Sequence, residues 1–161
     1  MMTEIKPLTA EAFAKYGDVI EVDSKEPIGI NYGYTERFHD LANIDATAEG
    51  GRAGVSIFRS QPLPMPISIK IMERHPLSSQ AFMPLSNEPY LVVVAPAGEF
   101  DESRIEVFLA QPGQGVNYAA GTWHHFCLAL NKPSNFLVVD RIGKGHNCDE
   151  VELKELKSIV V

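Results

Sequence analysis

Hydrophobic and polar residues alternate along this chain in short segments. The segments are rich in β-branched and aromatic residues, and turns that contain proline or glycine separate them. No long stretch has the 3.6-residue period of an amphipathic helix, so the chain lacks the helices that βαβ units need. The pattern therefore predicts an all-β sandwich or barrel, whose strands we place at residues 54–60, 67–75, 90–96, 105–110, 123–130 and 135–142.

Two short helices are predicted near the ends of the chain. Thr9 is a suitable N-cap for a helix over residues 10–16, and Gly17 follows where a helix-ending glycine is common. A second short helix is expected around residues 149–157. The eleven prolines and twelve glycines are spread over the whole chain without a linker-like stretch. We therefore expect a single domain over residues 1–161.

Alternation within residues 67–75 predicts which polar side chains enter the barrel. Ile67, Ile69 and Ile71 share one face of the predicted strand, and Glu73 and His75 continue that face. A face lined by isoleucine is the buried one. We therefore expect the carboxylate and the imidazole to point inward.

Two adjacent histidines, His124 and His125, occupy the strand predicted at residues 123–130. Consecutive side chains of a strand point to opposite faces, so only one of them can enter the barrel. His124 shares its face with Phe126, Leu128 and Leu130. This bulkier set favours His124 as the inward residue, and we interpret His125 as a packing or surface histidine.

These faces predict that Glu73, His75 and His124 meet in one interior. Gln80 follows His75 after a short turn and can return on the adjacent strand. Burying a carboxylate and two imidazoles costs several kcal/mol unless they are paired or bind a metal. A barrel that contains such a cluster is typically a binding or catalytic site.

Composition and charge narrow the classes of partner. The net charge is −7 and the pI is near 5.2, with no cluster of basic residues, so we expect neither a nucleic-acid nor a membrane partner. No signal-peptide pattern and no apolar run of about 20 residues occurs. Two cysteines are too few for a disulfide framework. We expect a cytoplasmic protein that acts on a small molecule.

Two segments resemble the motifs of the cupin superfamily. Residues 113–124, GQGVNYAAGTWH, are similar to the second cupin motif, with Ala119 in the place of the usual proline. Residues 73–80, ERHPLSSQ, are similar to the first motif, in which Glu73 replaces the first histidine and Gln80 the glutamate. The resemblance implies a jelly-roll barrel whose motif residues surround a metal or active-site cavity.

A more specific resemblance covers nearly the whole chain. The strings IKPLTAEAFAKYGDVI, NYGYTERFHDLA, MERHPLSSQAFMPL, AAGTWHHFCLAL and FLVVDRIGKGHNC resemble the ureidoglycolate lyase family. This resemblance implies a homodimeric enzyme of allantoin (purine) catabolism that splits (S)-ureidoglycolate into glyoxylate and urea. It also implies a possible metal requirement, with Ni²⁺ or Mn²⁺ as the candidates.

The chemistry of this substrate assigns expected roles. Cleavage of a hemiaminal needs a base, an acid and a cation for the carboxylate. Glu73, His75 and His124 are the candidates for proton transfer. If a metal binds, its ligands would come from these three residues and Gln80. The candidates for contact with the substrate are Gln80, Arg59, Arg37, Arg141 and Lys144.

Other functions stay open at this point. Cupin scaffolds host many chemistries, so a different metal-dependent enzyme, such as a dioxygenase or an isomerase, is one alternative. A non-catalytic module that binds a small carboxylate is the other. The sequence leaves open whether a metal is needed and which of the three proton-transfer candidates is the base.

Overall fold

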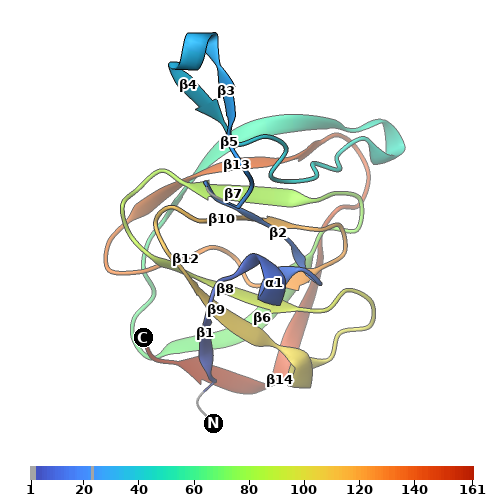
Figure 1. Cartoon of the computed structure of the whole chain (residues 1–161). Helices are drawn as coiled ribbons and strands as arrows, with labels where there is room; N and C mark the ends of the chain where they lie inside the picture. The colour runs from blue at the N-terminus through green and yellow to red at the C-terminus, as the bar shows by residue number, and fades with distance from the viewer. Residues whose placement is uncertain (1–2, 23) are drawn as a thin grey trace.

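Mostly antiparallel strands form two sheets that curl toward each other in this computed structural model, which describes residues 3–22 and 24–161 (Figure 1). The larger sheet has the order β1-β9-β8-β11-β6-β14, with β12 paired to β8. Its strands are β1 (Ile5–Pro7), β6 (Ile67–Arg74), β8 (Tyr90–Ala95), β9 (Glu106–Ala110), β11 (Trp123–His124), β12 (Leu128–Ala129) and β14 (Asp149–Ile159).

The smaller sheet has the order β2-β10-β7-β13-β5. Its strands are β2 (Gly17–Ile20), β5 (Arg52–Ser60), β7 (Gln80–Pro84), β10 (Gly115–Tyr118) and β13 (Ser134–Ile142). Together the sheets form the mainly-β, cupin-like jelly roll that the sequence predicts. Short 3-10 turns interrupt the connections at Asn31–Gly33, Ala48–Gly50 and Glu102–Arg104.

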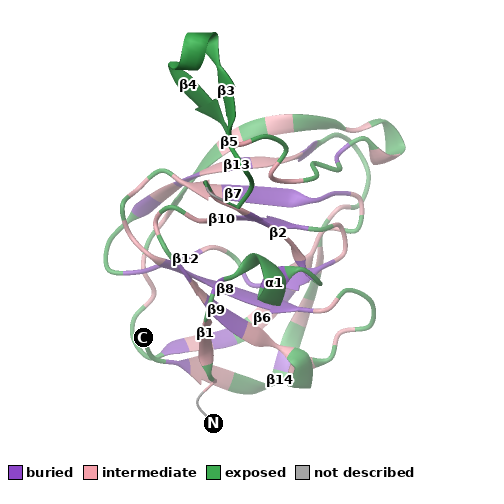
Figure 2. Ribbon diagram, in the orientation of Figure 1, coloured by how far each residue is buried: buried purple, intermediate pink, exposed green. Residues whose placement is uncertain are grey.

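Two hydrophobic cores stabilise this arrangement, and Figure 2 shows the buried strands that form them. The first core lies between the sheets and takes residues from both, including Phe13, Phe82, Val94, Phe108 and Tyr118. The second core lies within the curl of the larger sheet alone, and its members include Ile67, Ile69, Met72, Val93, Trp123, Leu128 and Leu130.

The predicted N-terminal helix is present but short. Helix α1 spans Ala10–Phe13, and the Thr9 hydroxyl accepts a hydrogen bond from the Ala12 amide as an N-cap should. Gly17 begins β2 instead of ending the helix. Its φ is +151°, and a Cβ there would lie 1.8 Å from the Asn117 carbonyl oxygen, so only glycine fits.

The prediction of a C-terminal helix around residues 149–157 is wrong, because this segment is strand β14. It pairs antiparallel with β6, and alternate side chains such as Leu153 and Ile159 are buried in the second core. The Glu- and Lys-rich composition favours a helix locally, but the pairing with β6 and the burial override that preference.

An irregularity in the β6–β14 pairing changes which residues share a face. The register shifts between Glu152 and Lys157. Ile67 and Ile69 consequently pack in the second core together with Met72, which has the opposite parity. The expectation that Glu73 shares a face with these isoleucines is therefore wrong. Glu73 lies opposite His124 in the register, beside the first core.

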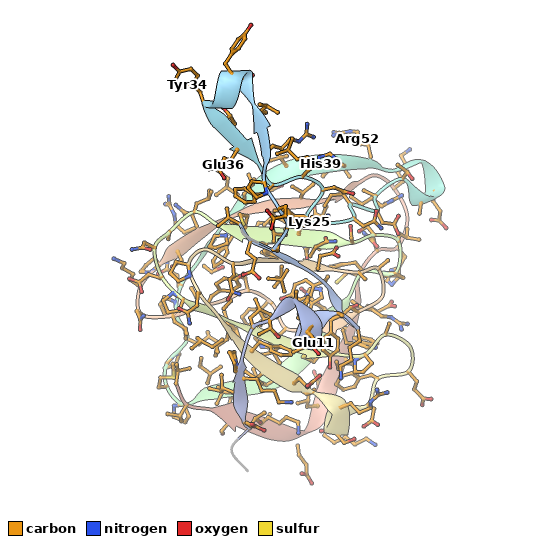
Figure 3. All side chains as sticks on the ribbon, in the orientation of Figure 1. Glu11, Lys25, Tyr34, Glu36, His39 and Arg52 are labelled. Atoms are coloured by element: carbon orange, nitrogen blue, oxygen red, sulfur yellow. The ribbon has the colours of Figure 1, made fainter. Side chains whose placement is uncertain are left out.

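A separate hairpin extends away from both sheets (Figures 1 and 2). It consists of β3 (Ile28–Ile30) and β4 (Thr35–Arg37) and pairs with neither large sheet. Tyr32 and Tyr34 at its tip are fully exposed, and Figure 3 shows Tyr34 beside that tip. Among the described residues, no helix has the length and apolar character needed to cross a membrane.

Candidate active site

The end of β6 and the short strand β11 bring Glu73, His75 and His124 together. His124 pairs in register with Glu73 on one side and with Val94, a member of the first core, on the other. The His124 Nδ1 atom lies 3.9 Å from Glu73 Oε1, and the two imidazole centroids are 5.1 Å apart. One donor atom from each of the three residues lies within 4.8 Å of the others. The three side chains thus form one cluster.

His124 carries an unpartnered ring nitrogen. Its ring is buried and stacks on Tyr118, with ring centroids 4.2 Å apart. Nδ1 lies 3.1 Å from the His125 carbonyl, which can only accept, so Nδ1 carries the proton and Nε2 the lone pair. Nε2 is buried and has no hydrogen-bond partner among the described residues. Burial and the neighbouring His75 lower the pKa of His124 to about 3, so the ring is neutral.

His75 has an oxygen atom beside each ring nitrogen. Nδ1 lies 2.8 Å from the Asn147 carbonyl oxygen, and Nε2 lies 3.0 Å from Gln80 Oε1. The Gln80 amide nitrogen donates to Asp140 Oδ2 at 3.1 Å, which fixes the amide oxygen toward His75. A neutral imidazole has only one N–H, so two acceptors would otherwise face each other at 3.0 Å. A metal ion bound by both Nε2 and the amide oxygen would satisfy these two acceptors.

The same geometry fits a divalent metal. Both histidines direct Nδ1 at a backbone carbonyl, which is how proteins orient metal-binding imidazoles and leave Nε2 for the ion. A carboxylate, two imidazoles and an amide oxygen suit ions such as Ni²⁺ or Mn²⁺. The residues that would hold the ion are Glu73, His75, Gln80 and His124.

Glu73 lies at the accessible side of the cluster. Its side chain is 27% exposed, whereas His124 is 1% exposed. Glu150 is its direct cross-strand neighbour, and Cys148 Sγ lies 3.8 Å from its Oε2. Burial and the nearby carboxylates raise the pKa of Cys148. Negative charge therefore accumulates around Glu73, on the side from which a substrate would approach.

The predicted arginines do not join this cluster. Arg59 donates to Asn135 Oδ1 on the face of β5 where Val55 and Ile57 are exposed, so the expectation that Arg59 points inward is wrong. Arg37 lies on the extended hairpin. Arg141 is buried, but it donates to three backbone carbonyls, those of Ala48, Glu49 and Lys144.

Lys144, the remaining predicted cation, has its backbone carbonyl bonded to Arg141. It lies in the exposed loop between β13 and β14, and Asn147 of the same loop contacts His75. Arg74 pairs with Asp149 and lies over the Trp123 ring.

Sequence reasoning missed the residues that orient the cluster. One of them is Asp140 on β13, which accepts a hydrogen bond from the Gln80 amide nitrogen. Alternation carries the signal, because Asp140 shares the parity of Phe136 and Val138, which face the first core. The Asn147 carbonyl carries no such signal, because the loop conformation alone places it.

Comparison with known proteins identifies relatives over nearly the full length. Residues 1–160 match the family model described as Ureidoglycolate lyase. A protein named ureidoglycolate lyase from Burkholderia mallei (strain NCTC 10229) is 55% identical over 151 residues, which cover 94% of this chain and 89% of that protein. One from Pseudomonas syringae pv. syringae (strain B728a) is 50% identical over 158 residues, covering 98% and 93%. The family model and these relatives cover nearly the whole chain, so the chain belongs to the ureidoglycolate lyase family.

Proposed function

We propose that this protein is a lyase that cleaves (S)-ureidoglycolate into glyoxylate and urea in the breakdown of allantoin. Family membership supports the reaction. One structural observation carries the proposal further: Glu73, His75, Gln80 and His124 form a single cluster with a free buried lone pair on His124. Such a cluster can bind a polar substrate and transfer protons.

Glu73 is the proposed group for proton transfer. Its carboxylate takes the proton of the substrate hydroxyl, the oxygen forms the carbonyl of glyoxylate, and the carbon–nitrogen bond breaks. The electron pair of that bond goes to the urea nitrogen, which receives the proton back from Glu73. The side chain is the most accessible member of the cluster, so it can reach the substrate. Atoms and charge balance without a covalent intermediate.

The two histidines are proposed to hold and polarise the reacting groups. The His124 lone pair accepts a hydrogen bond from the substrate, and His75, which Asn147 and Gln80 hold in place, lies beside it with its ring centroid 5.1 Å from that of His124. A divalent ion held by the cluster would supply Lewis-acid polarisation of the substrate oxygens. Lys144 is the proposed partner of the substrate carboxylate.

Product analysis with purified protein tests the reaction. The protein is incubated with (S)-ureidoglycolate, and urea, ammonia and glyoxylate are quantified together. Equal amounts of urea and glyoxylate are expected. Ammonia without urea would indicate a hydrolase, and the absence of any product would reject the proposed activity.

We also propose that the protein is a cytoplasmic homodimer. An isolated two-stranded hairpin is only marginally stable in water, yet β3 and β4 extend away from the sheets with two exposed tyrosines. A second copy that packs against the hairpin would stabilise it. The two free cysteines suit a reducing compartment. Sedimentation of the intact protein tests the dimer.

A further inference from the structure

A second cavity, separate from the candidate active site, lies beside His125. Its volume is about 460 Å³, within the range of small-ligand pockets. Leu63, Pro64, Pro66 and Phe126 form its apolar walls. It includes none of the active-site cluster. Ser68 and Lys70 of β6 also line it, and they alternate with Ile67 and Ile69 of the second core, so they face away from that core.

His125 directs a hydrogen-bond acceptor at this cavity. The residue is only 4% exposed, and its backbone amide donates to the Val93 carbonyl. Nδ1 lies 2.9 Å from the Phe126 carbonyl, so Nδ1 donates and Nε2 carries the lone pair. Nε2 has no hydrogen-bond partner among the described residues, and it keeps some accessible surface. His125 is one of the residues that line the cavity, so Nε2 is the atom that it can offer to a ligand there.

The contact of Nδ1 with the Phe126 carbonyl sets the role of the other ring nitrogen. Because Nδ1 donates to that carbonyl, Nε2 is the acceptor of the ring. A ligand group that contacts Nε2 must then be an O–H or N–H donor. His125 was expected to be a packing or surface histidine, and the structure places it as a buried residue that also lines a cavity.

Lys70 adds a positive charge to the same cavity. It is exposed on β6, and no described carboxylate lies within ion-pair distance of it. An anionic group of a ligand could approach this ammonium without displacing an existing partner. Ser68 supplies a hydroxyl that can donate or accept beside it.

From these features we infer that the cavity is a binding site for a small organic acid with an apolar body and a hydrogen-bond donor at the opposite end. The carboxylate contacts Lys70, the body packs between the two prolines and Phe126, and the donor reaches His125 Nε2. His124 and His125 then serve two different sites, one on each side of the same chain segment. The inference does not depend on the proposed lyase reaction.

Binding of 4-hydroxybenzoate to the full chain tests this inference. The probe combines a carboxylate, a flat apolar ring and a phenol donor. Nitrogen-15 NMR of histidine-labelled protein should show saturable movement of the His125 Nε2 signal, with little change at His146. Benzoate, which lacks the donor, should bind about 2- to 10-fold more weakly, as the loss of one net hydrogen bond predicts.

Variants test the role of the charge. Lys70→Gln should weaken binding of 4-hydroxybenzoate about 2- to 5-fold, as for an exposed ion pair, and should leave binding of the neutral 4-hydroxybenzamide unchanged. Lys154→Gln, an exposed lysine on β14, is the matched control and should change neither. Because Lys70 is exposed, its replacement should leave folding intact.

Three results would overturn the inference. The first is the absence of saturable binding at millimolar probe. The second is equal binding to the native protein and to Lys70→Gln. The third is a His125 signal that moves with protein concentration instead of with the probe, which would mean that a second copy of the chain covers the cavity.

Discussion

Replacement of Glu73 by glutamine should lower turnover and leave the fold at least as stable as before. The substitution preserves the size of the side chain but removes the carboxylate that we propose as the proton-transfer group. General acid–base catalysis contributes about 10²- to 10⁴-fold to a rate. We therefore expect kcat/KM for ureidoglycolate to fall by that factor, which corresponds to roughly 3–5 kcal/mol of lost transition-state stabilisation.

The effect on stability should have the opposite sign. Glu73 and Glu150 are direct cross-strand neighbours on β6 and β14, and like charges in that position destabilise a sheet by about 0.2–1 kcal/mol. The Glu73 carboxylate has no close cationic partner among the described residues, since its contact with His124 is 3.9 Å long. Removing the charge should therefore raise the free energy of unfolding slightly or leave it unchanged.

Glu150→Gln is the matched control, because it removes the same repulsion from the other strand. It should reproduce the change in stability with turnover near the native value. Both variants are compared by urea denaturation and by steady-state formation of urea. If Glu73→Gln retains turnover within about threefold of native, Glu73 is not the base. If Glu73→Gln loses more than about 1 kcal/mol of stability, repulsion between Glu73 and Glu150 does not govern the stability at this position.

Three further substitutions test other parts of the structure. Asp140→Ala removes the acceptor that orients the Gln80 amide beside His75. Turnover, and Ni²⁺ affinity measured by calorimetry, should each fall about 10- to 100-fold. Unchanged values would refute this orienting role. Tyr16→Phe should cost about 1.5–3 kcal/mol in urea denaturation near neutral pH. Burial raises the pKa of Glu106, but hydrogen bonds from Tyr16 and two lysines outweigh burial and hold that pKa at about 2. The cost of Tyr16→Phe should therefore disappear as the pH falls toward 2 and the carboxylate protonates. A cost that does not change with pH would contradict this linkage. Gly17→Ala should destabilise the fold by more than about 3 kcal/mol, because its Cβ would collide with the Asn117 carbonyl. Gly33→Ala, also at positive φ but in open space, should cost only about 1 kcal/mol in the same assay. Equal losses would exclude the collision as the cause.

The strands of this fold were predictable because their signal is local. Alternating β-branched segments bounded by proline and glycine identified β5, β6, β8, β9 and β13 within a few residues. The N-cap at Thr9 is likewise a local signal. Strand β14 was mistaken for a helix because its composition favours one, and only its partner β6 determines its conformation.

The site residues were identified, but part of the reasoning behind them failed. His124 was predicted to face inward because it shares parity with Leu128 and Leu130, yet both leucines pack in the second core. The chain leaves the strand between β11 and β12, so parity does not carry across residues 125–127. The spacing of the cupin motif located His124 more dependably than the hydrophobic pattern.

The irregularity in β6 and β14 explains why the site can exist at all. With regular pairing, Glu73 would share a face with Ile67 and Ile69 and enter the second core, which contains no cation among its described members. A carboxylate buried there would cost several kcal/mol. Alternation on β6 instead breaks between Ile69 and Met72, opposite the register shift in β14, and Glu73 lies opposite His124 beside the first core. Bulges of this kind commonly re-aim a side chain beside an active site. The departure from alternation that misled the sequence interpretation is therefore the feature that assembles the proposed catalytic cluster.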